Sequence, residues 1–240
     1  MVQNDIKIAI CLLTNEDKHL EEWLKHHRNY GFSNFLIYCD DFQYIEHKAR
    51  YTQKAYFHLV KSTNNPRFQM DIYEQCCKRY KDDYEFILFL DSDEYYESKT
   101  GDIQEDIRLI KEEFGEFDGL SLSWRMYGKS EPYFETRQPI ENYTQWYPNN
   151  HIKSLVNPSK VIKWNDPHKP TLTKNSKFIN ELGEKVNSPI EPHSSENIWV
   201  KHIWTRSLEE WKEKVNRRGF YEFYKRKMEQ FYEHNNQCNT

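Results

Sequence analysis

Two carboxylates stand two positions apart, directly after the most apolar stretch of the sequence. That stretch covers residues 86–90, and Asp91, Ser92, Asp93 and Glu94 follow it. Hard divalent cations prefer carboxylate oxygens and keep some positions for water or phosphate. A chain of this composition contains about one Asp-x-Asp by chance, so the pair alone is a weak signal, but its place after a buried strand strengthens it. We predict that Asp91 and Asp93 bind a divalent metal, with a solvated acidic turn as the alternative.

A histidine late in the chain is the candidate for a third metal ligand. His202 lies within the apolar segment 199–204, which an inward-facing strand would bury. Imidazole is a common metal ligand and proton carrier. The alternative is a hydrogen-bonded histidine of the core. His168 and His193, each beside a proline in a loop, are weaker candidates.

Polar residues also follow the first two predicted strands. Thr14, Asn15 and Glu16 end the first strand, and Asp40 and Asp41 end the second. Ligands of open α/β sheets bind beyond the carboxyl ends of the strands, so these oxygens are candidates to bind the base and ribose of a nucleotide. Helix capping by Asn15 is the alternative, and the two roles are compatible.

These residues require a sheet whose strands alternate with helices. The pattern predicts strands over 6–13, 35–39, 56–60 and 86–90, and helices over 16–30 and 67–81. Gly31 stands where a left-handed residue would end the first helix. Strands that alternate with helices imply an α/β fold with parallel strands and right-handed crossovers.

The second half of the chain has a different character. A helix is predicted over 102–114 and a strand over 119–124, and residues 127–195 are rich in Pro, Asn, Ser and aromatics, with short strand-like pieces at 152–156 and 161–164. A helix returns over 207–234. Ser207 and Glu210 form a capping box at its start, and Gly219 is expected to bend or split it.

Composition excludes several classes of protein. The chain has 240 residues and a net charge of −4, whereas a general nucleic-acid binder should be basic. An aromatic fraction of 16% argues against disorder. No stretch approaches the roughly 20 apolar residues of a membrane span, and the N-terminus lacks the features of a signal peptide. The five cysteines include no Cys-x-x-Cys pair, which indicates reduced thiols in a cytoplasmic protein.

The segment 206–227 is basic. It contains eight Lys or Arg and four Glu, a net charge of +4, interleaved with aromatic residues. We favour an amphipathic helix docked on the core with a solvated basic face. Peripheral contact with an anionic membrane, on its inner face, is the alternative, and Arg206 or Arg217 is a candidate to bind phosphate.

Motifs that run in order over about residues 8–219 resemble those of one enzyme family. They are Asn15-Glu16 with Trp23, His27 and Gly31; Gln69, Tyr73 and Cys76 ahead of Asp91, Asp93 and Glu94; Trp124, Gly128 and Ser130; Lys153, Pro158 and His168; and His202, Ser207, Glu210, Lys214 and Gly219. Singly most are weak, and together they are specific. The chain resembles glycosyltransferases of the GT-A fold, in particular the family 92-like group, related to family 2, and its bacterial and viral relatives. It departs from the family pattern at Lys201 and Ile203, which flank His202, and in the missing membrane anchor of the eukaryotic members.

The resemblance implies a single Rossmann-like GT-A domain over 1–240, with a mixed, mostly parallel sheet flanked by helices. Residues 1–100 would form the nucleotide-binding half, 101–206 the acceptor side and 207–240 a C-terminal helical segment. A hexosyl or deoxyhexosyl group would move, with inversion, from a UDP- or GDP-type donor to a saccharide acceptor in polysaccharide biosynthesis. Mn²⁺ or Mg²⁺ would be held by Asp91, Asp93 and His202. The expected donor-binding residues are Thr14, Asn15, Glu16, Asp40, Gln69, Asp91, Ser92 and Arg206.

The irregular middle segment supplies the candidates for the acceptor side. Its aromatic residues would stack on sugar faces: Trp124, Tyr127, Trp146, Tyr147 and Trp164. An inverting transfer needs a base within hydrogen-bond reach of the acceptor hydroxyl. Glu131, Glu135, Asp166 and His168 all lie in this region, and we take Glu131 and His168 as the catalytic candidates.

Three other functions remain open from the sequence. A haloacid-type phosphatase also places Asp-x-Asp after a strand, although Glu94 here stands where Thr or Val is usual. A sugar-nucleotide pyrophosphorylase would need a glycine-rich loop after the first strand, which residues 11–18 do not contain. A non-catalytic carbohydrate-binding protein would use the same aromatic residues without metal or nucleotide.

Overall fold

The computed structural model describes residues 5–14, 18–39, 55–61, 63, 65–128, 139–216 and 226–238. The strands are β1 (Ile8–Thr14), β2 (Phe35–Cys39), β3 (Ala55–Leu59), β4 (Phe86–Leu90), β5 (Glu94–Ser98), β6 (Gly119–Gly128), β7 (Gln145–Val156), β8 (Val161–Trp164), β9 (Pro170–Leu172), β10 (Phe178–Ile179) and β11 (Ile198–His202). The α-helices are α1 (Leu20–Asn29), α3 (Phe68–Tyr80), α4 (Ile103–Phe114), α5 (Leu208–Asn216) and α6 (Met228–Gln237), and the short 3-10 helices are η1 (Ile140–Asn142) and η2 (Pro158–Lys160).

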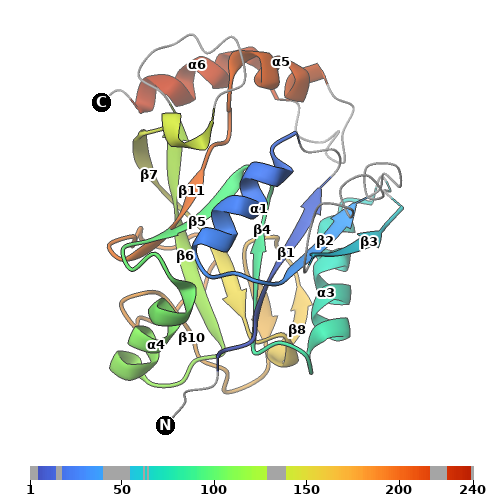
Figure 1. The fold of residues 1–240 in the computed structure, drawn as a ribbon, viewed down its shortest axis with the longest axis vertical. Coiled ribbons are helices and arrows are strands. Elements are labelled where there is room, and N and C mark those ends of the chain that lie inside the picture. Colours follow the sequence, from blue (N-terminus) through green and yellow to red (C-terminus); the bar gives the residue numbers. More distant parts are fainter. Residues whose placement is uncertain are drawn as a thin grey trace.

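One large sheet runs through the molecule (Figure 1). Its strand order is β3-β2-β1-β4-β7-β6-β11-β5, and β10 pairs with β6. Five of its eight described pairings are parallel and three are antiparallel. The predicted α/β fold with a mixed, mostly parallel sheet is therefore confirmed. A separate hairpin joins β8 and β9.

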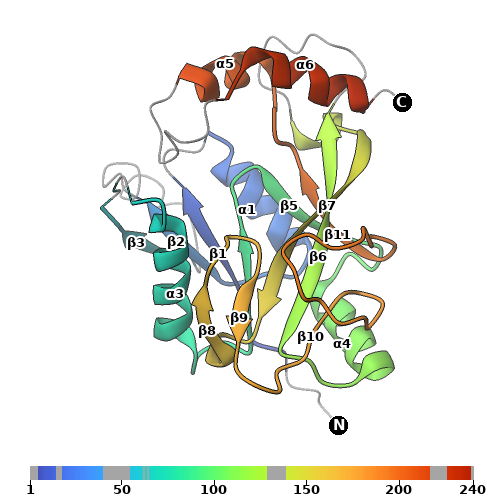
Figure 2. The same cartoon turned by 180° about the vertical axis from the view of Figure 1, so that it is seen from behind.

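Helices cover both faces of the sheet. Successive residues of a strand point to opposite faces, so each central strand offers apolar side chains on both. In β1, Ile8, Ile10 and Leu12 belong to the core cluster under α1 and α4, whereas Ala9 and Cys11 belong to the cluster under α3 and Trp164. Figure 1 shows α1 and α4 in front of the sheet, and Figure 2 shows α3 and the β8–β9 hairpin on the opposite face. Each strand of this central region is thus buried on both faces, which explains its nearly continuous apolar sequence.

The helices follow their sequence signals closely. In α1 the buried residues are Leu20, Trp23, Leu24 and His27, at the predicted spacing. Gly31 has φ +85°, the left-handed conformation expected after this helix. The capping box also forms, because the Ser207 backbone N–H donates to Glu210 Oε2 at 3.3 Å and Ser207 Oγ accepts from the Glu210 backbone N–H at 3.2 Å.

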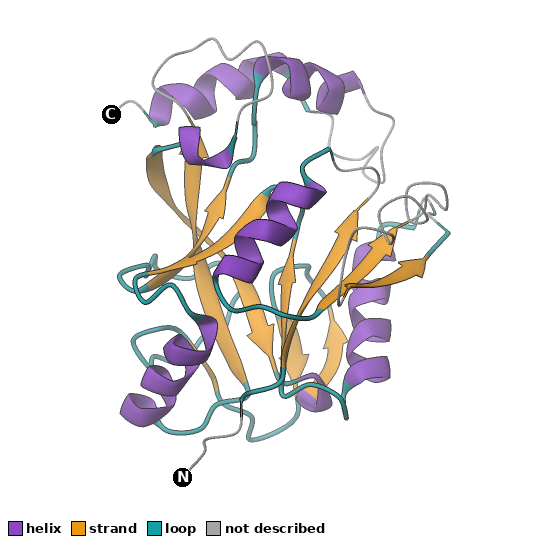
Figure 3. Cartoon of the chain, in the orientation of Figure 1, coloured by secondary structure: helices purple, strands orange, loops and turns teal. Residues whose placement is uncertain are grey.

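The two C-terminal helices lie beyond the end of the sheet toward which β1, β2 and β4 run (Figure 3). The helix predicted over 207–234 is interrupted, since α5 ends at Asn216 and α6 begins at Met228; the expected break at Gly219 lies outside the described residues. Leu208 and Trp211 of α5 pack on Phe231 of α6. The described part of the basic segment is therefore docked on the protein, as favoured above, and membrane contact stays a prediction.

Several strands depart from the sequence prediction. β9 and β10 were not predicted, and β6 continues to Gly128 where a strand over 119–124 was predicted. β5 follows the acidic turn directly and pairs with β11, although no Gly or Pro marks its start. β7 extends from Gln145, where only 152–156 was expected to be extended, because its outer half is mostly solvent-exposed and carries no apolar signal. No described helix is long and apolar enough to cross a bilayer. All five cysteines are buried.

Candidate active site

The acidic turn, residues 91–94, lies where the parallel strands end. Thr14 at the end of β1 is level with Cys39 of β2, and Leu12 is level with Leu90 of β4. The carboxyl ends of β1, β2 and β4 therefore meet at one edge, as predicted. The expected nucleoside-binding residues Asn15, Glu16 and Asp40 follow β1 and β2 in the chain and lie outside the described residues.

Asp91 is held by three neighbours. Its backbone N–H donates to Glu94 Oε2 at 2.8 Å. One carboxylate oxygen accepts from Gln69 Nε2 at 2.9 Å, and the other accepts from Lys153 Nζ at 2.8 Å. The Asp91 side chain is still 38% exposed, so it keeps lone pairs toward solvent. Gln69 thus reaches the site through Asp91, as a residue that positions the carboxylate.

Lys153 and Glu94 form a fully buried ion pair at the base of the turn. Lys153 Nζ is 3.0 Å from Glu94 Oε2, and neither side chain has exposed surface. Burial opposes the charge on Lys153, but Asp91 and Glu94 outweigh it and raise the pKa of its ammonium. Burial raises the pKa of Glu94 to about 7, against the pull of Lys153. The Lys153 ammonium therefore stays charged and holds the acidic turn from inside the protein.

Asp93 meets a second lysine and the predicted histidine. Lys214 Nζ of α5 lies 2.8 Å from Asp93 Oδ2, and His202 Nε2 lies 3.5 Å from Asp93 Oδ1. The Asp93 carbonyl accepts from the Ile203 N–H at 2.9 Å. Burial favours the neutral acid, but Lys214 and His202 hold the pKa of Asp93 well below its usual range. Asp93 is an anion held between β11 and α5.

Arg206 supplies a third cation at the turn. Its Nη2 donates to the Ser92 carbonyl at 2.6 Å, and the residue is 7% exposed. Its φ is +52°, a left-handed conformation that a bulky residue keeps only when its surroundings enforce it. The prediction placed both Arg206 and Ser92 at the donor site, and the fold brings them together beside Asp91 and Asp93.

Three histidine rings surround Trp124 next to this turn. The ring centroids of His151, His168 and His202 lie 5.1, 5.0 and 4.3 Å from that of Trp124. His168 Nδ1 is 3.0 Å from the Ile152 carbonyl, so Nδ1 carries the proton. Burial, together with Lys153, lowers the pKa of His168 to about 3. A base works best when its pKa is near the working pH, so this environment favours a neutral, hydrogen-bonded His168. Its catalytic role stays a prediction, and Glu131 lies outside the described residues.

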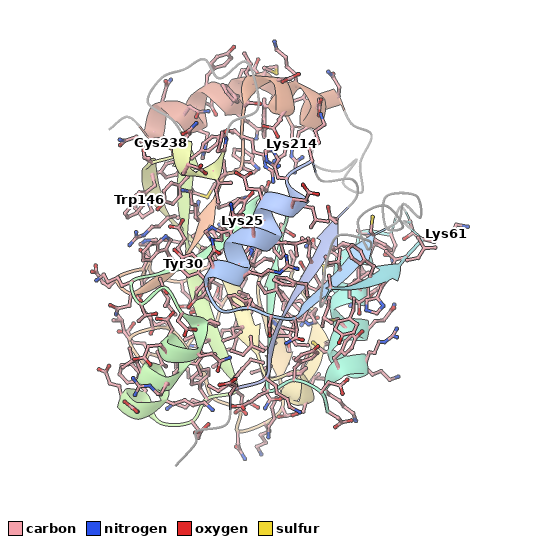
Figure 4. All side chains as sticks on the ribbon, viewed as in Figure 1. Lys25, Tyr30, Lys61, Trp146, Lys214 and Cys238 are labelled. Carbon is pink, nitrogen blue, oxygen red and sulfur yellow. The ribbon has the colours of Figure 1, made fainter. Side chains whose placement is uncertain are left out.

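The aromatic residues expected on the acceptor side divide into exposed and buried. Trp146 is 39% exposed, whereas Trp164 has no exposed surface. Trp164 packs on Tyr73 and Phe89 in the core, so the expectation that it stacks on a sugar is wrong. Tyr127 is also buried, and Lys201 Nζ lies 4.6 Å from its ring centre. Trp146, labelled in Figure 4, is the most exposed residue of this set.

The acidic turn has donor chemistry that suits a cation. Two carboxylates and an imidazole are ligands that Mn²⁺ accepts, and carboxylates suit Mg²⁺. Within the described ranges, however, no three His, Cys, Asp or Glu side chains converge as metal ligands. Asp91 and Asp93 instead each accept a hydrogen bond from a lysine ammonium group, which stands in for a metal ion there. The two carboxylates thus suit a cation, and in this structure the cations are Lys153 and Lys214.

Lys153 and Lys214 were named from the sequence only as motif residues and were given no role in the site, although each has a further signal. Lys153 interrupts the apolar stretch 152–156, where a buried charge requires a partner. Lys214 comes three positions after Trp211, so it shares the inward face of α5. What spacing alone does not reveal is the partner, because Asp91 and Asp93 are 62 and 121 positions away from these lysines.

Comparisons with known proteins give one family and several distant structures. The family model for glycosyltransferase family 92 matches residues 6–233. No curated protein sequence matches the chain. Similar solved structures include S. aureus TarS 1–349 in complex with UDP, which is 17% identical over 64% of this chain and 47% of that chain, with a TM-score of 0.42. The same protein in complex with UDP-GlcNAc is 19% identical over 64% of this chain and 46% of that chain, with a TM-score of 0.41. HddC from Yersinia pseudotuberculosis is 10% identical over 72% of this chain and 90% of that chain, with a TM-score of 0.37. The chain spans between 25% and 48% of the TarS chains.

Proposed function

Since this chain belongs to glycosyltransferase family 92, as its motifs indicated, we propose that it transfers a sugar from a nucleotide-sugar donor to a saccharide acceptor. The observation that carries the proposal is the acidic turn itself. Asp91 and Asp93 lie at the carboxyl ends of parallel strands, and basic groups from Lys214 and Arg206 lie against the same turn. Carboxylates and fixed cations side by side suit a diphosphate together with its metal ion.

The donor would lie along the edge where β1, β2 and β4 end. Thr14 and the residues that follow β1 and β2, Asn15, Glu16 and Asp40, would bind the nucleoside, and Arg206 and Ser92 would meet the diphosphate. A UDP- or GDP-type donor carrying a hexosyl or deoxyhexosyl group is the class we propose. This is the position at which open α/β sheets bind nucleotides.

Mn²⁺ or Mg²⁺ is the proposed cofactor. Asp91 and Asp93 would hold it, with His202 as a neighbour on Asp93. When bound, such an ion neutralises the charge that develops on the departing nucleoside diphosphate. Lys153 has a different part, because its buried ammonium keeps Asp91 aimed at the edge of the sheet. Gln69 supports the same carboxylate from α3.

The acceptor would approach from the side of β6 and β7. Trp146 offers the exposed aromatic face there, and we propose that a sugar ring of the acceptor stacks on it. Inversion requires a base at the acceptor hydroxyl. Glu131 and His168 are the candidates. Burial and Lys153 lower the pKa of His168 to about 3, which makes it a weak base, so Glu131 is the stronger proposal.

Ligand-dependent stabilisation tests this function. The melting temperature is measured with a panel of nucleoside diphosphates and nucleotide sugars, with and without Mn²⁺, on wild type, Asp93→Asn and Glu209→Gln. Glu209 is an exposed acid on α5 and serves as the matched control. A ligand at 100 times its dissociation constant adds about 2.7 kcal/mol. We expect one nucleotide to stabilise wild type and Glu209→Gln in a Mn²⁺-dependent way, and Asp93→Asn to lose that shift.

Other outcomes point to other functions. No shift with any nucleotide contradicts the proposed donor site. Stabilisation by glycans alone, unchanged in Asp93→Asn, would support a non-catalytic carbohydrate-binding protein. Release of phosphate from simple phosphate esters without an acceptor would support a phosphatase.

A further inference from the structure

Lys214 occupies a cation position on Asp93. Its Nζ lies 2.8 Å from Asp93 Oδ2 and 2.6 Å from the Trp204 carbonyl. The Lys214 and Asp93 side chains are 19% and 14% exposed. Figure 4 shows Lys214 on the side of α5 that faces the sheet. The contact therefore ties the C-terminal helix to the acidic turn by a charge pair that solvent reaches only in part.

The two lysines of the site are held differently. Lys153 has no exposed surface and lies between two carboxylates, at 2.8 Å from Asp91 and 3.0 Å from Glu94. Lys214 has one carboxylate partner, one carbonyl partner and some exposed surface. Removing Lys153 would leave a buried carboxylate without its cation, whereas Lys214 can leave Asp93 toward solvent. Lys214 is the exchangeable cation of the pair.

We propose that Lys214 is a built-in competitor for the metal at Asp93, and that it exchanges this carboxylate for the donor diphosphate when metal and donor bind. This inference rests on the proposed function, since it assigns Lys214 a place in the same donor site. Asp93 Oδ2 would be the position that the ammonium and the metal take in turn.

Electrostatics forces the exchange in one direction. A divalent cation and an ammonium cannot share one carboxylate oxygen, because their repulsion at a few ångströms is large away from bulk water. Once displaced, Lys214 keeps the neutral Trp204 carbonyl as its hydrogen-bond partner among the residues that the structure describes. The donor diphosphate is the anion that arrives with the metal, and a lysine bonded to it stays paired.

The exchange makes metal and donor bind together. Without the diphosphate, the metal must leave Lys214 unpaired to reach Asp93, so metal alone binds weakly. With the diphosphate present, the same ammonium has a new anionic partner, so the metal binds more tightly. By linkage, the metal then strengthens diphosphate binding by the same factor.

Calorimetric titrations of three proteins test this idea. Wild type, Lys214→Met and Lys212→Met are titrated first with Mn²⁺ alone and then with UDP or GDP at saturating Mn²⁺. Lys212 is an exposed lysine on the same helix and is the matched control. We expect Lys214→Met to bind Mn²⁺ alone about tenfold more tightly than wild type, and to bind the nucleotide about tenfold more weakly. Lys212→Met should match wild type in both titrations.

The affinities of Lys214→Met for Mn²⁺ and for the nucleotide are expected to change in opposite directions, which distinguishes the ways in which the proposal can fail. Equal Mn²⁺ affinity in wild type and Lys214→Met would overturn the competitor role while leaving the metal site in place. Absence of Mn²⁺ binding in all three proteins, with and without nucleotide, would overturn the proposed metal site and this inference with it. Lys214→Gln, checked by far-UV circular dichroism, replaces Lys214→Met if that variant does not fold.

Discussion

Lys153 on β7 and Glu94 at the start of β5 form an ion pair of 3.0 Å in which neither side chain has exposed surface. The same ammonium lies 2.8 Å from Asp91. One lysine therefore joins an inner strand of the sheet to both ends of the acidic turn. The geometry of the candidate donor site depends on a charge that lies entirely inside the protein.

Removal of this ammonium is expected to destabilise the fold strongly. Lys153→Met leaves a buried carboxylate without its cation, a change that typically costs about 3–5 kcal/mol. Urea unfolding of wild type and variant measures the difference. Lys163→Met, on an exposed position of β8, should stay within about 0.5 kcal/mol. Glu94→Gln should recover part of the loss in the Lys153→Met background, and a loss below about 1 kcal/mol in the single variant would contradict the pairing.

The attachment of α5 to α1 is expected to depend on pH. His19 Nδ1 lies 3.1 Å from Glu22, and its Nε2 is hydrogen-bonded to Glu210. Burial opposes the charge on His19, but Glu210 and Glu22 outweigh it and raise its pKa above the ordinary 6.5. Despite burial, the hydrogen bond from His19 and the charge of Arg206 lower the pKa of Glu210 to about 2. A raised histidine pKa contributes stability that is complete below 6.5 and is lost as the pH rises through the raised value.

His19→Gln tests the sign of this dependence. The variant should be about 1–3 kcal/mol less stable than wild type at mildly acidic pH. The difference should shrink as the pH is raised past the pKa of His19. Lys18→Met removes a neighbouring but exposed pair with Glu213 and should cost about 0.5 kcal/mol or less. A difference between wild type and His19→Gln that grows with pH would show that His19 is neutral in the native state.

Most of the fold could be predicted from the pattern of apolar residues in the sequence. The strand predicted over 86–90 is β4, and the helix predicted over 67–81 is α3 (Phe68–Tyr80), because both elements are buried and carry their own periodicity. β5 was missed since it begins at Glu94, directly after the acidic turn, with no Gly or Pro to mark its start. The outer half of β7 was missed because a strand that faces solvent lacks an apolar signal.

The candidate site could be predicted from the sequence only in part. Asp91 and Asp93 could be located because strand and carboxylates are adjacent in the sequence. Their partners could not, since Lys153 and Lys214 reach them through the pairing of β7 with β4 and the docking of α5. A charged residue on an inward face shows that a partner exists, but the identity of the partner is a property of the tertiary structure.

Gln69 is expected to act as a positioning residue for Asp91. Its Nε2 donates to Asp91 at 2.9 Å and to Tyr73 Oη at 2.8 Å. Gln69→Leu removes the donor and should weaken binding of the Mn²⁺–nucleotide pair about five- to tenfold, equivalent to about 1–1.4 kcal/mol, which is in the range of one hydrogen bond. Gln69→Glu should be worse, because it places a second carboxylate beside Asp91. Tyr73→Phe keeps the bond to Asp91 and is the control. Equal nucleotide affinity in wild type, Gln69→Leu and Gln69→Glu would exclude this role.

Trp146 is expected to affect the acceptor and not the donor. It lies on β7, the strand that also carries Lys153. The residue is 39% exposed, and Arg125 Cζ lies 4.4 Å from the ring centre. Loss of an apolar stacking surface in Trp146→Ala should raise the KM for the acceptor about five- to tenfold, equivalent to about 1–1.4 kcal/mol. Trp146→Phe keeps an aromatic face and should recover most of the affinity. Donor binding, measured by calorimetry on the same proteins, should not change, because Trp146 has no described contact with Asp91 or Asp93. An equal loss of donor and acceptor affinity would instead assign Trp146 a structural role in the β6–β7 pair.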